Sequence, residues 1–187
     1  MKQFARLALA AALIVSTAAA PARADDKFDL QSKLTAALKA ARSFVATTVV
    51  VANGVSTTTT YVAPDRTKTD VLLGQSTRQI ITIGDVSYTS RDGAAFERGT
   101  VPTALVAQLK SLTEVSVSAL APDVAADGAT YGAFKTIVGL APQAVTLTCT
   151  YDKKTYRLAK CASSEVIQTF GNYDDPKNVV EAPKAAS

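Results

Sequence analysis

The apolar residues between positions 27 and 42 have the spacing of one face of an α-helix. Side chains four positions apart lie above one another on a helix, which has about 3.6 residues per turn. Asp29 lies near the start, where a carboxylate interacts favourably with the helix dipole. The pattern predicts an amphipathic helix that packs one face against the remaining protein. The residues of that face are Phe28, Leu30, Leu34, Leu38 and Ala41.

From Ser43 the pattern changes to short runs of β-branched residues separated by turn signals. Asn53-Gly54 is typical of a two-residue hairpin, and other Gly, Pro and Asp pairs mark further turns. Tight turns place strands that are neighbours in sequence side by side and antiparallel. The pattern predicts a meander of six strands over residues 43–52, 55–63, 66–72, 77–83, 86–91 and 94–98.

Leucines recur at helical spacing again after Pro102, at Leu105, Leu109 and Leu112, and predict a second helix. The stretch that follows, through Gly128, is rich in Ala, Pro and Asp and predicts a loop. Strands resume after this loop. They are predicted over residues 130–138, 144–150, 156–162 and 165–170.

Nine or ten twisted strands in one sheet either split into two layers or curl. The predicted fold class is therefore α+β, with a strongly curved antiparallel sheet, a half-open β-barrel, and helices covering its concave side. The volume inside such a curl is either ordinary core or a ligand cavity, and periodicity alone favours core. The residues assigned to this volume are Ile81, Ile83, Tyr88, Phe96, Leu105, Leu109 and Leu112.

Residues 1–24 have the pattern of a cleavable signal peptide. Lys2 and Arg6 precede an apolar run at residues 7–15, and Ala22-Arg23-Ala24 is an A-x-A cleavage site. The apolar run is too short to span a bilayer, which argues against the alternative of a retained membrane anchor. We therefore predict a protein that is exported to the periplasm.

Removal of this leader leaves 163 of the 187 residues, a length that suits one domain. We predict that domain over residues 25–183, with a disordered tail at 184–187. The leader holds three of the 20 basic residues and none of the 16 acidic ones, so the exported chain has 17 basic and 16 acidic residues. This balance does not favour a nucleic-acid partner, which needs a concentrated basic surface.

The chain contains no histidine, which excludes an imidazole base, a Ser-His or Cys-His pair and a His metal site. Aspartates at predicted turns usually bond their own backbone, and two adjacent acids make an incomplete cage for calcium. We therefore predict no enzyme activity, no metal and no cofactor. The acids considered are Asp65, Asp85, Asp152, Asp174 and Asp175.

Cys149 and Cys161 lie on two predicted strands on either side of a hairpin turn. An exported protein meets an oxidising compartment, where such a pair forms a disulfide. The alternative, a redox-active pair, usually has C-x-x-C spacing. The sequence therefore predicts a structural disulfide across the hairpin.

Four short motifs follow one another over most of the exported chain. They are Tyr61-Val62-Ala63-Pro64-Asp65-Arg66, residues 80–88, Gly93-Ala94-Ala95-Phe96, and residues 170–176 leading to Val180-Glu181-Ala182-Pro183. Together they resemble the LolA-like periplasmic lipoprotein-carrier superfamily, the fold type of LolA, LolB and LppX. Phe96 stands where the superfamily more often has a tryptophan, a difference that bears on the ligand more than on the fold.

The resemblance implies a half-open barrel with a helical lid around an apolar cavity that shields acyl chains in the aqueous periplasm. The expected function is that of a monomeric periplasmic carrier or binding protein for a hydrophobic ligand, lipid or acylated protein, with a membrane protein as a further partner. Arg66 and Arg78 are candidates for headgroup or lid contacts; the alternative is that they are solvated surface arginines. The alternative function is a periplasmic sensor or regulatory module of the same fold that acts through a protein partner.

Overall fold

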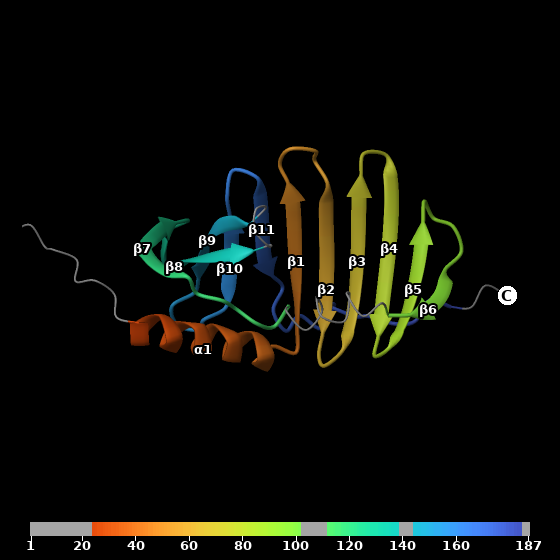
Figure 1. The fold of residues 1–187 in the computed structure, drawn as a ribbon. Coiled ribbons are helices and arrows are strands. Elements are labelled where there is room, and N and C mark those ends of the chain that lie inside the picture. The colour runs from red at the N-terminus through yellow and green to blue at the C-terminus, as the bar shows by residue number, and fades with distance from the viewer. Residues whose placement is uncertain (1–23, 102–111, 139–143, 185–187) are drawn as a thin grey trace, which may run out of the picture.

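The computed structural model describes residues 24–101, 112–138 and 144–184 (Figure 1). Its helix α1 (Ala24–Ala40) confirms the predicted amphipathic helix. Phe28, which the sequence assigned to the packed face, is 71% exposed, so that assignment was wrong. Residues 1–23 of the predicted signal peptide lie outside the described residues, as do Leu105 and Leu109 of the predicted second helix. None of the helices described is long and apolar enough to cross a membrane.

The strands described form a single antiparallel sheet of eleven strands. Their order across the sheet is β6-β5-β4-β3-β2-β1-β11-β10-β9-β8-β7. The strands are β1 (Ser43–Val50), β2 (Ser56–Val62), β3 (Arg66–Leu73), β4 (Ser76–Ile83), β5 (Val86–Arg91), β6 (Glu97–Thr100), β7 (Ala119–Ala126), β8 (Ala129–Val138), β9 (Val145–Tyr151), β10 (Leu158–Ala162) and β11 (Val166–Gly171).

Two meanders make up this sheet. Strands β1–β6 form one and β7–β11 form the other, and β1 pairs with β11 where they meet, from Val45 opposite Gly171 to Val50 opposite Val166. Figure 1 shows β8–β10 turned strongly away from the direction of β1–β4, so the sheet is curved. In the part of the chain described, no pairing joins β6 to β7, and the sheet is open. The predicted curved antiparallel sheet is confirmed, with eleven strands instead of nine or ten.

The additional strand is β7, in a segment for which the sequence predicts a loop. This strand contains Pro122, which has no N–H to donate to a neighbouring strand. It lies at the edge of the sheet, and its pairing with β8 shifts register between Ala121 and Val124. An edge position and a bulge both accommodate proline. The loop prediction was wrong here because it took proline as evidence against any strand.

The register of the strands divides the sheet into two faces. Phe44 of β1 and Phe134 of β8 share a core cluster with three leucines of α1, Leu30, Leu34 and Leu38. We call the face that carries Phe44 and Phe134 the helix face, and the other the outer face. Since directly paired residues of antiparallel strands point to the same side, the register assigns each strand residue to one of these faces.

The main core lies between α1 and the helix face of the second meander. The α1 leucines are at most 7% exposed, and Phe44 and Phe134 are fully buried. Figure 1 shows α1 crossing the ends of the strands in this half of the sheet. Burial of one leucine or phenylalanine side chain stabilises a protein by roughly 1.5–3 kcal/mol, so these contacts hold α1 on the sheet.

Beyond Tyr173, the segment that follows β11 crosses the outer face of the first meander. The Asn178 side-chain amide donates to Ser43 Oγ at 3.0 Å, and Arg66 Nη1 donates to the Val180 carbonyl at 3.5 Å. Ser43 and Arg66 both belong to the outer face by register. Val180 is only 3% exposed, so this segment is packed against the sheet.

Candidate functional site

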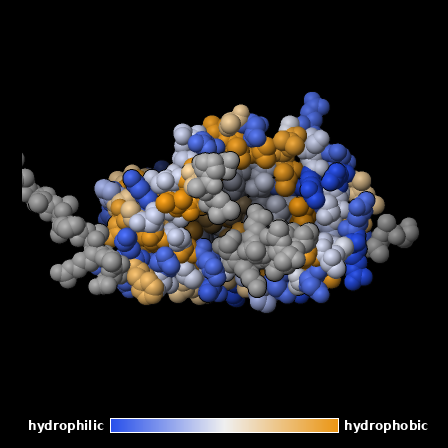
Figure 2. Space-filling model, viewed as in Figure 1, coloured by the Kyte–Doolittle hydropathy of each residue, from blue (hydrophilic) through white to orange (hydrophobic). Residues whose placement is uncertain are grey.

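A cavity of about 360 Å³ lies on the helix face, between α1, residues 112–116 and strands β8–β11. Its volume is within the range of pockets that bind small ligands. Figure 2 shows hydrophobic residues gathered around a hollow on this side of the molecule. The lining is mainly apolar. The apolar lining residues are Leu38, Leu112, Val115, Phe134, Val138, Leu147, Cys149, Leu158, Cys161 and Phe170.

Hydrogen bonds fix one wall of the cavity, residues 112–118, to both α1 and the sheet. The Val115 amide donates to Thr35 Oγ1 at 3.2 Å, and the Val117 amide donates to Gln31 Oε1 at 3.0 Å. At the other end, the Ser118 amide and hydroxyl both donate to the Lys135 carbonyl, at 2.8 and 2.9 Å. Polar side chains of α1 therefore satisfy the backbone of a segment that is not a strand, and they hold Val115 at the cavity.

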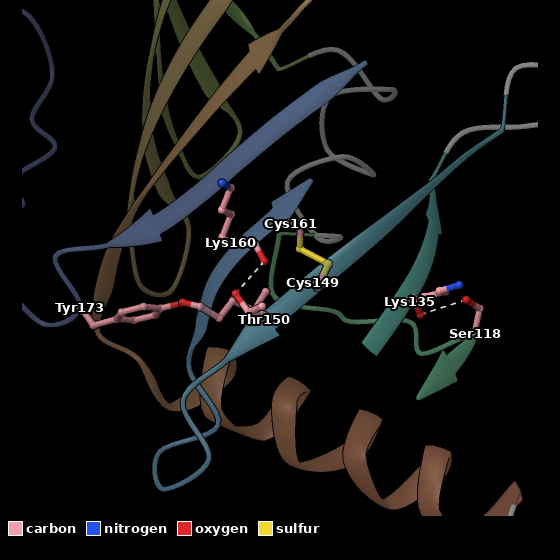
Figure 3. The surroundings of a disulfide bond; sticks show 8 residues. Ser118, Lys135, Cys149, Thr150, Lys160, Cys161 and Tyr173 are labelled. Atoms are coloured by element: carbon pink, nitrogen blue, oxygen red, sulfur yellow. Dashed lines mark hydrogen bonds between the residues drawn. A yellow bond between two sulfur atoms is a disulfide. The ribbon is translucent and has the colours of Figure 1, made fainter. Parts of the chain in front are cut away.

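The disulfide between Cys149 and Cys161 forms part of the cavity lining. The two cysteines are directly opposite one another on β9 and β10, and Figure 3 shows the bond joining these neighbouring strands. Cys149 is fully buried and Cys161 is 4% exposed. The predicted disulfide is confirmed in pairing and position. Its burial on an apolar surface suits a structural bond better than a redox-active one.

A second cluster supports the cavity at Leu158. The Tyr173 hydroxyl donates to the Leu158 carbonyl at 3.0 Å, and burial raises the pKa of Tyr173 to about 12. The Arg157 guanidinium lies 4.9 Å from the centre of the Tyr173 ring and forms an ion pair with Asp174. A hydrogen bond from the Arg42 amide, and then the Arg157 charge, hold the pKa of Asp174 below its usual value. This predicted turn aspartate is therefore structural.

Within the described part of the chain, the polar residues at the cavity offer no arrangement for acid-base or nucleophilic chemistry. They are Glu114, Ser116, Thr136 and Gln168, and Glu114 is exposed to solvent. No cluster of three or more His, Cys, Asp or Glu residues in the described ranges is placed to hold a metal ion. What this lining can do is exclude water from an apolar group and offer polar contacts at one side.

The structure brings only part of the predicted cavity set to this cavity. Leu112 lines it. Ile81, Ile83 and Tyr88 belong to the outer face, because Ile81 pairs with Tyr88 while its neighbour Thr82 continues the row that contains Phe44. The register therefore separates these three residues from Leu112.

The remaining predicted residues lie at three different places. Phe96 lines a separate depression of about 460 Å³ at the ends of β2–β5. Arg66 lies on the outer face and holds the Val180 carbonyl, so its contact is with the C-terminal segment. Arg78 lies on the helix face, directly opposite Arg91 of β5.

Sequence reasoning missed the residues of β8–β11 that form most of the lining. Phe134, Leu147 and Phe170 all lie in strands that the sequence predicts correctly. Their alternation with polar neighbours shows which residues share a face of a strand. It does not show which face points toward the helix, because a register slip of one residue exchanges the two faces. The predicted disulfide could have indicated the direction, because the bonded Cys149 and Cys161 must lie on the same face of β9 and β10.

Comparison with known proteins gives a fold and no close relative. No protein-family model matches the chain, and no curated protein matches it. LprF from Mycobacterium bovis matches with a TM-score of 0.56 at 12% identity, over 89% of this chain and 99% of LprF. The Mycobacterium tuberculosis lipoprotein LppX matches with a TM-score of 0.55 at 14% identity, over 82% of this chain and 98% of LppX. These matches confirm the predicted LppX-type fold, so the chain shares its fold with LprF and with the lipoprotein LppX.

Proposed function

We propose that this protein is a periplasmic carrier or binding protein that shields a hydrophobic ligand, a lipid or the acyl chain of a lipoprotein. The observation that carries the proposal is the apolar cavity on the helix face, walled by α1, residues 112–116 and β8–β11. The fold shared with the lipoprotein LppX supports it.

The energetics of an acyl chain suit such a cavity. Each methylene moved from water into an apolar environment contributes about 0.8 kcal/mol. A soluble protein with a dry apolar pocket can therefore hold one acyl chain without any covalent chemistry. On the sheet side, Phe170 is partly buried and Val138 is 42% exposed, so both side chains offer apolar surface to a ligand.

Native mass spectrometry on detergent-free protein tests whether the cavity holds a ligand. We expect an added mass that is released as lipid on denaturation, and uptake of a fluorescent fatty acid by stripped protein. A clean mass together with no uptake of fatty acid or acylated peptide would show that the cavity is ordinary core, and would overturn the proposal.

Two neighbouring residues of β8 provide a matched pair of variants. Thr136 lines the cavity, whereas Ile137 points to the outer face and is 55% exposed. Thr136→Trp fills the cavity and is expected to weaken fatty-acid binding by about tenfold or more. Ile137→Trp adds similar bulk outside it and is expected to bind as the parent does. Equal binding by both variants would show that the ligand binds outside this cavity.

The periplasmic part of the proposal rests on the signal-peptide pattern. We propose that export removes residues 1–24, so that the mature chain begins at Asp25. N-terminal sequencing of protein recovered from a periplasmic extract is expected to start at this residue. Protein found only in the cytoplasm with its first residues intact would contradict it.

A further inference from the structure

Arg78 and Arg91 form a pair of like charges on the helix face. They are direct partners in the register of β4 and β5, so their Cβ atoms are about 5 Å apart. Arg78 lies on the helix face because Thr82, four positions along β4, continues the row that contains Phe44. Two cations in this position repel one another, which destabilises the pair of strands unless an anion lies between them.

No described carboxylate forms an ion pair with these arginines, although Glu97 lines the same depression and offsets one of the two charges. Both side chains are exposed, and neither forms an ion pair with any residue in the described ranges. Two nearby acids have other partners. Asp92 accepts from the Thr77 amide at 2.8 Å, and Asp70 accepts from the Gln79 side chain at 2.6 Å on the outer face.

The surface around the pair is hollowed and has room for a small group. A depression of about 440 Å³ is lined by Arg78, Thr89, Arg91, Ala94, Ala95 and Glu97. Two guanidinium groups and one carboxylate leave this depression with a net positive charge. Arginine binds phosphate through two parallel N–H···O bonds, and Thr89 adds a hydroxyl donor on the same face.

One row of paired residues joins the two arginines to the cavity across the sheet. From Arg78 the row passes through one residue of each strand on the helix face and reaches Gln168, which lines the cavity. Cys161, Cys149 and Phe134 continue the same row, and all three line the cavity. The complete row is Arg91, Arg78, Val71, Thr57, Thr48, Gln168, Cys161, Cys149 and Phe134.

The length of this row suits a lipid. From Arg78 to Gln168 there are four strand spacings, about 19 Å along the sheet. One bilayer leaflet, with its headgroup included, is about 20–22 Å thick, half of the whole bilayer. A lipid lying across the strands with its headgroup at the arginines therefore brings the end of its chain to Gln168, at the edge of the cavity.

We propose that Arg78 and Arg91 bind the phosphate group of an amphiphilic ligand whose acyl chain runs across the helix face and enters the cavity with its end. This inference rests on the proposed function and specifies its ligand as a phosphate-bearing lipid. Val71, Thr57 and Thr48 form the surface over which the chain lies between the two ends.

The test measures binding of two ligands that have the same acyl chain. One is palmitoyl lysophosphatidic acid and the other is monopalmitoylglycerol, which lacks the phosphate; inorganic phosphate alone is the third ligand. We expect the parent protein to bind the lysophosphatidic acid about tenfold more tightly than the glyceride, because hydrogen bonds between charged groups are strong. Inorganic phosphate is expected to compete only weakly, because it lacks the chain.

The variant Arg78→Gln with Arg91→Gln is expected to lose this preference and to bind the glyceride as the parent does. Loss of two like charges relieves repulsion, so a thermal melt of the free variant is expected to be unchanged or higher. The control is Arg98→Gln, an exposed arginine that pairs with Tyr88 on the outer face and is expected to retain the preference.

The outcomes separate this inference from the proposed function. Equal binding of the two lipids by parent and variant would keep the carrier function and overturn the phosphate site. Failure of the parent to bind either lipid would overturn both. Phosphate competition as strong as that of the phospholipid would identify a site for free phosphate, and would overturn the inferred link to the cavity.

Discussion

Gly132 lies on β8 directly opposite Tyr151 of β9, and a side chain at this position would overlap the tyrosine ring. Glycine lets the ring of Tyr151 lie flat over β8, close to Phe134, with ring centres 6.1 Å apart. It also lets Tyr151 stack on Tyr156, with ring centres 5.9 Å apart. One missing Cβ therefore permits an aromatic cluster next to the cavity.

Gly132→Ala is expected to lower the free energy of unfolding by about 1–3 kcal/mol, because the methyl group forces Tyr151 out of its place. Urea denaturation measures the change. The control is Gly171→Ala, since nothing lies within 4 Å of the Cβ position there. Tyr151→Leu combined with Gly132→Ala is expected to cost less than the sum of the two single changes. Equal effects of the two alanine variants would contradict this account.

The buried hydroxyl of Tyr173 predicts a loss of stability at high pH. Its pKa is raised to about 12 in the folded protein, whereas an unfolded tyrosine titrates near 10. Below pH 10 the Tyr173 hydroxyl is protonated in both the folded and the unfolded state, so its full contribution to stability is present. As the pH rises from 10 toward 12, only the unfolded state loses the proton, and the folded protein becomes less stable relative to it. Burial also raises the pKa of Tyr61 and Tyr151, which adds to the fall.

Tyr173→Phe is expected to show a smaller fall in the urea midpoint between about pH 9 and 12 than the parent does. Because both proteins contain the same lysines and other tyrosines, the effect of those groups on the pH dependence of stability cancels in the comparison. Parallel curves for parent and variant would show that Tyr173 titrates in the folded protein as it does when unfolded.

The isoleucines of β4 show why individual site residues could not be predicted. Ile81 is 6% exposed on the outer face, and its neighbour Thr82 is 1% exposed on the helix face. Both faces of the sheet are covered at this point. An apolar and a polar side chain next to one another in β4 are therefore both buried, and neither their alternation nor their hydrophobicity shows which one faces the cavity. The sequence placed Ile81 in the cavity because an apolar residue in a strand normally faces the core.

At the scale of elements, the hairpin of β9 and β10 is held by two kinds of contact. Cys149 and Cys161 form a disulfide, and Asp152 closes the turn by accepting bonds from the Lys154 and Thr155 amides. These bonds lower the pKa of Asp152. The sequence predicted both the turn and the bond, because local signals determine them.

Reduction of the disulfide is expected to lower the free energy of unfolding by about 3 kcal/mol, the chain-entropy value for a short loop. Urea denaturation with and without a reductant measures it. The double variant Cys149→Ala with Cys161→Ala is expected to be insensitive to the reductant. An equal response to reductant in both proteins would assign the effect to something other than this bond.

Element prediction was good wherever a turn signal and an apolar alternation agreed. The hairpin at Asn53-Gly54 joins β1 and β2 as expected, and β5 has the predicted bounds. It was wrong at β7, where Pro122 and an alanine-rich composition concealed an edge strand. Such a strand exists through its pairing with β8, a tertiary contact that no local pattern shows.

At the scale of the whole molecule, burial is unequal between the two meanders. The main core cluster joins α1 to residues of β8, β9 and β10, such as Phe134, Cys149 and Leu158. All four residues of β6, by contrast, are exposed. Local opening costs least where few side chains are buried, so β6 is expected to open more readily than β8–β10.

Hydrogen exchange is expected to be slowest in the amides of β9 and much faster in those of β6. Mass spectrometry of peptides from the two strands measures both in one sample. If β6 were protected as strongly as β9, the sheet would open only as one unit, and the difference in burial would have no consequence for its dynamics.

The order in which the two meanders join was beyond sequence reasoning. Each hairpin has its own turn residues, but the pairing of Val45 with Gly171 joins segments from the two ends of the domain. No local signal specifies such a contact.

Strand β11, the partner of β1, is the last strand to be synthesised, and this delay affects folding. A ribosome completes β1 long before β11, so the nascent first meander exposes the unpaired backbone of a β-branched strand to solvent. Free edges of this kind recruit other strands and promote aggregation. Val49 and Val50 lie at the end of this edge, opposite Ile167 and Val166. A chaperone that covers β1 until translation ends would therefore raise the yield of folded protein more than one that acts on the finished chain.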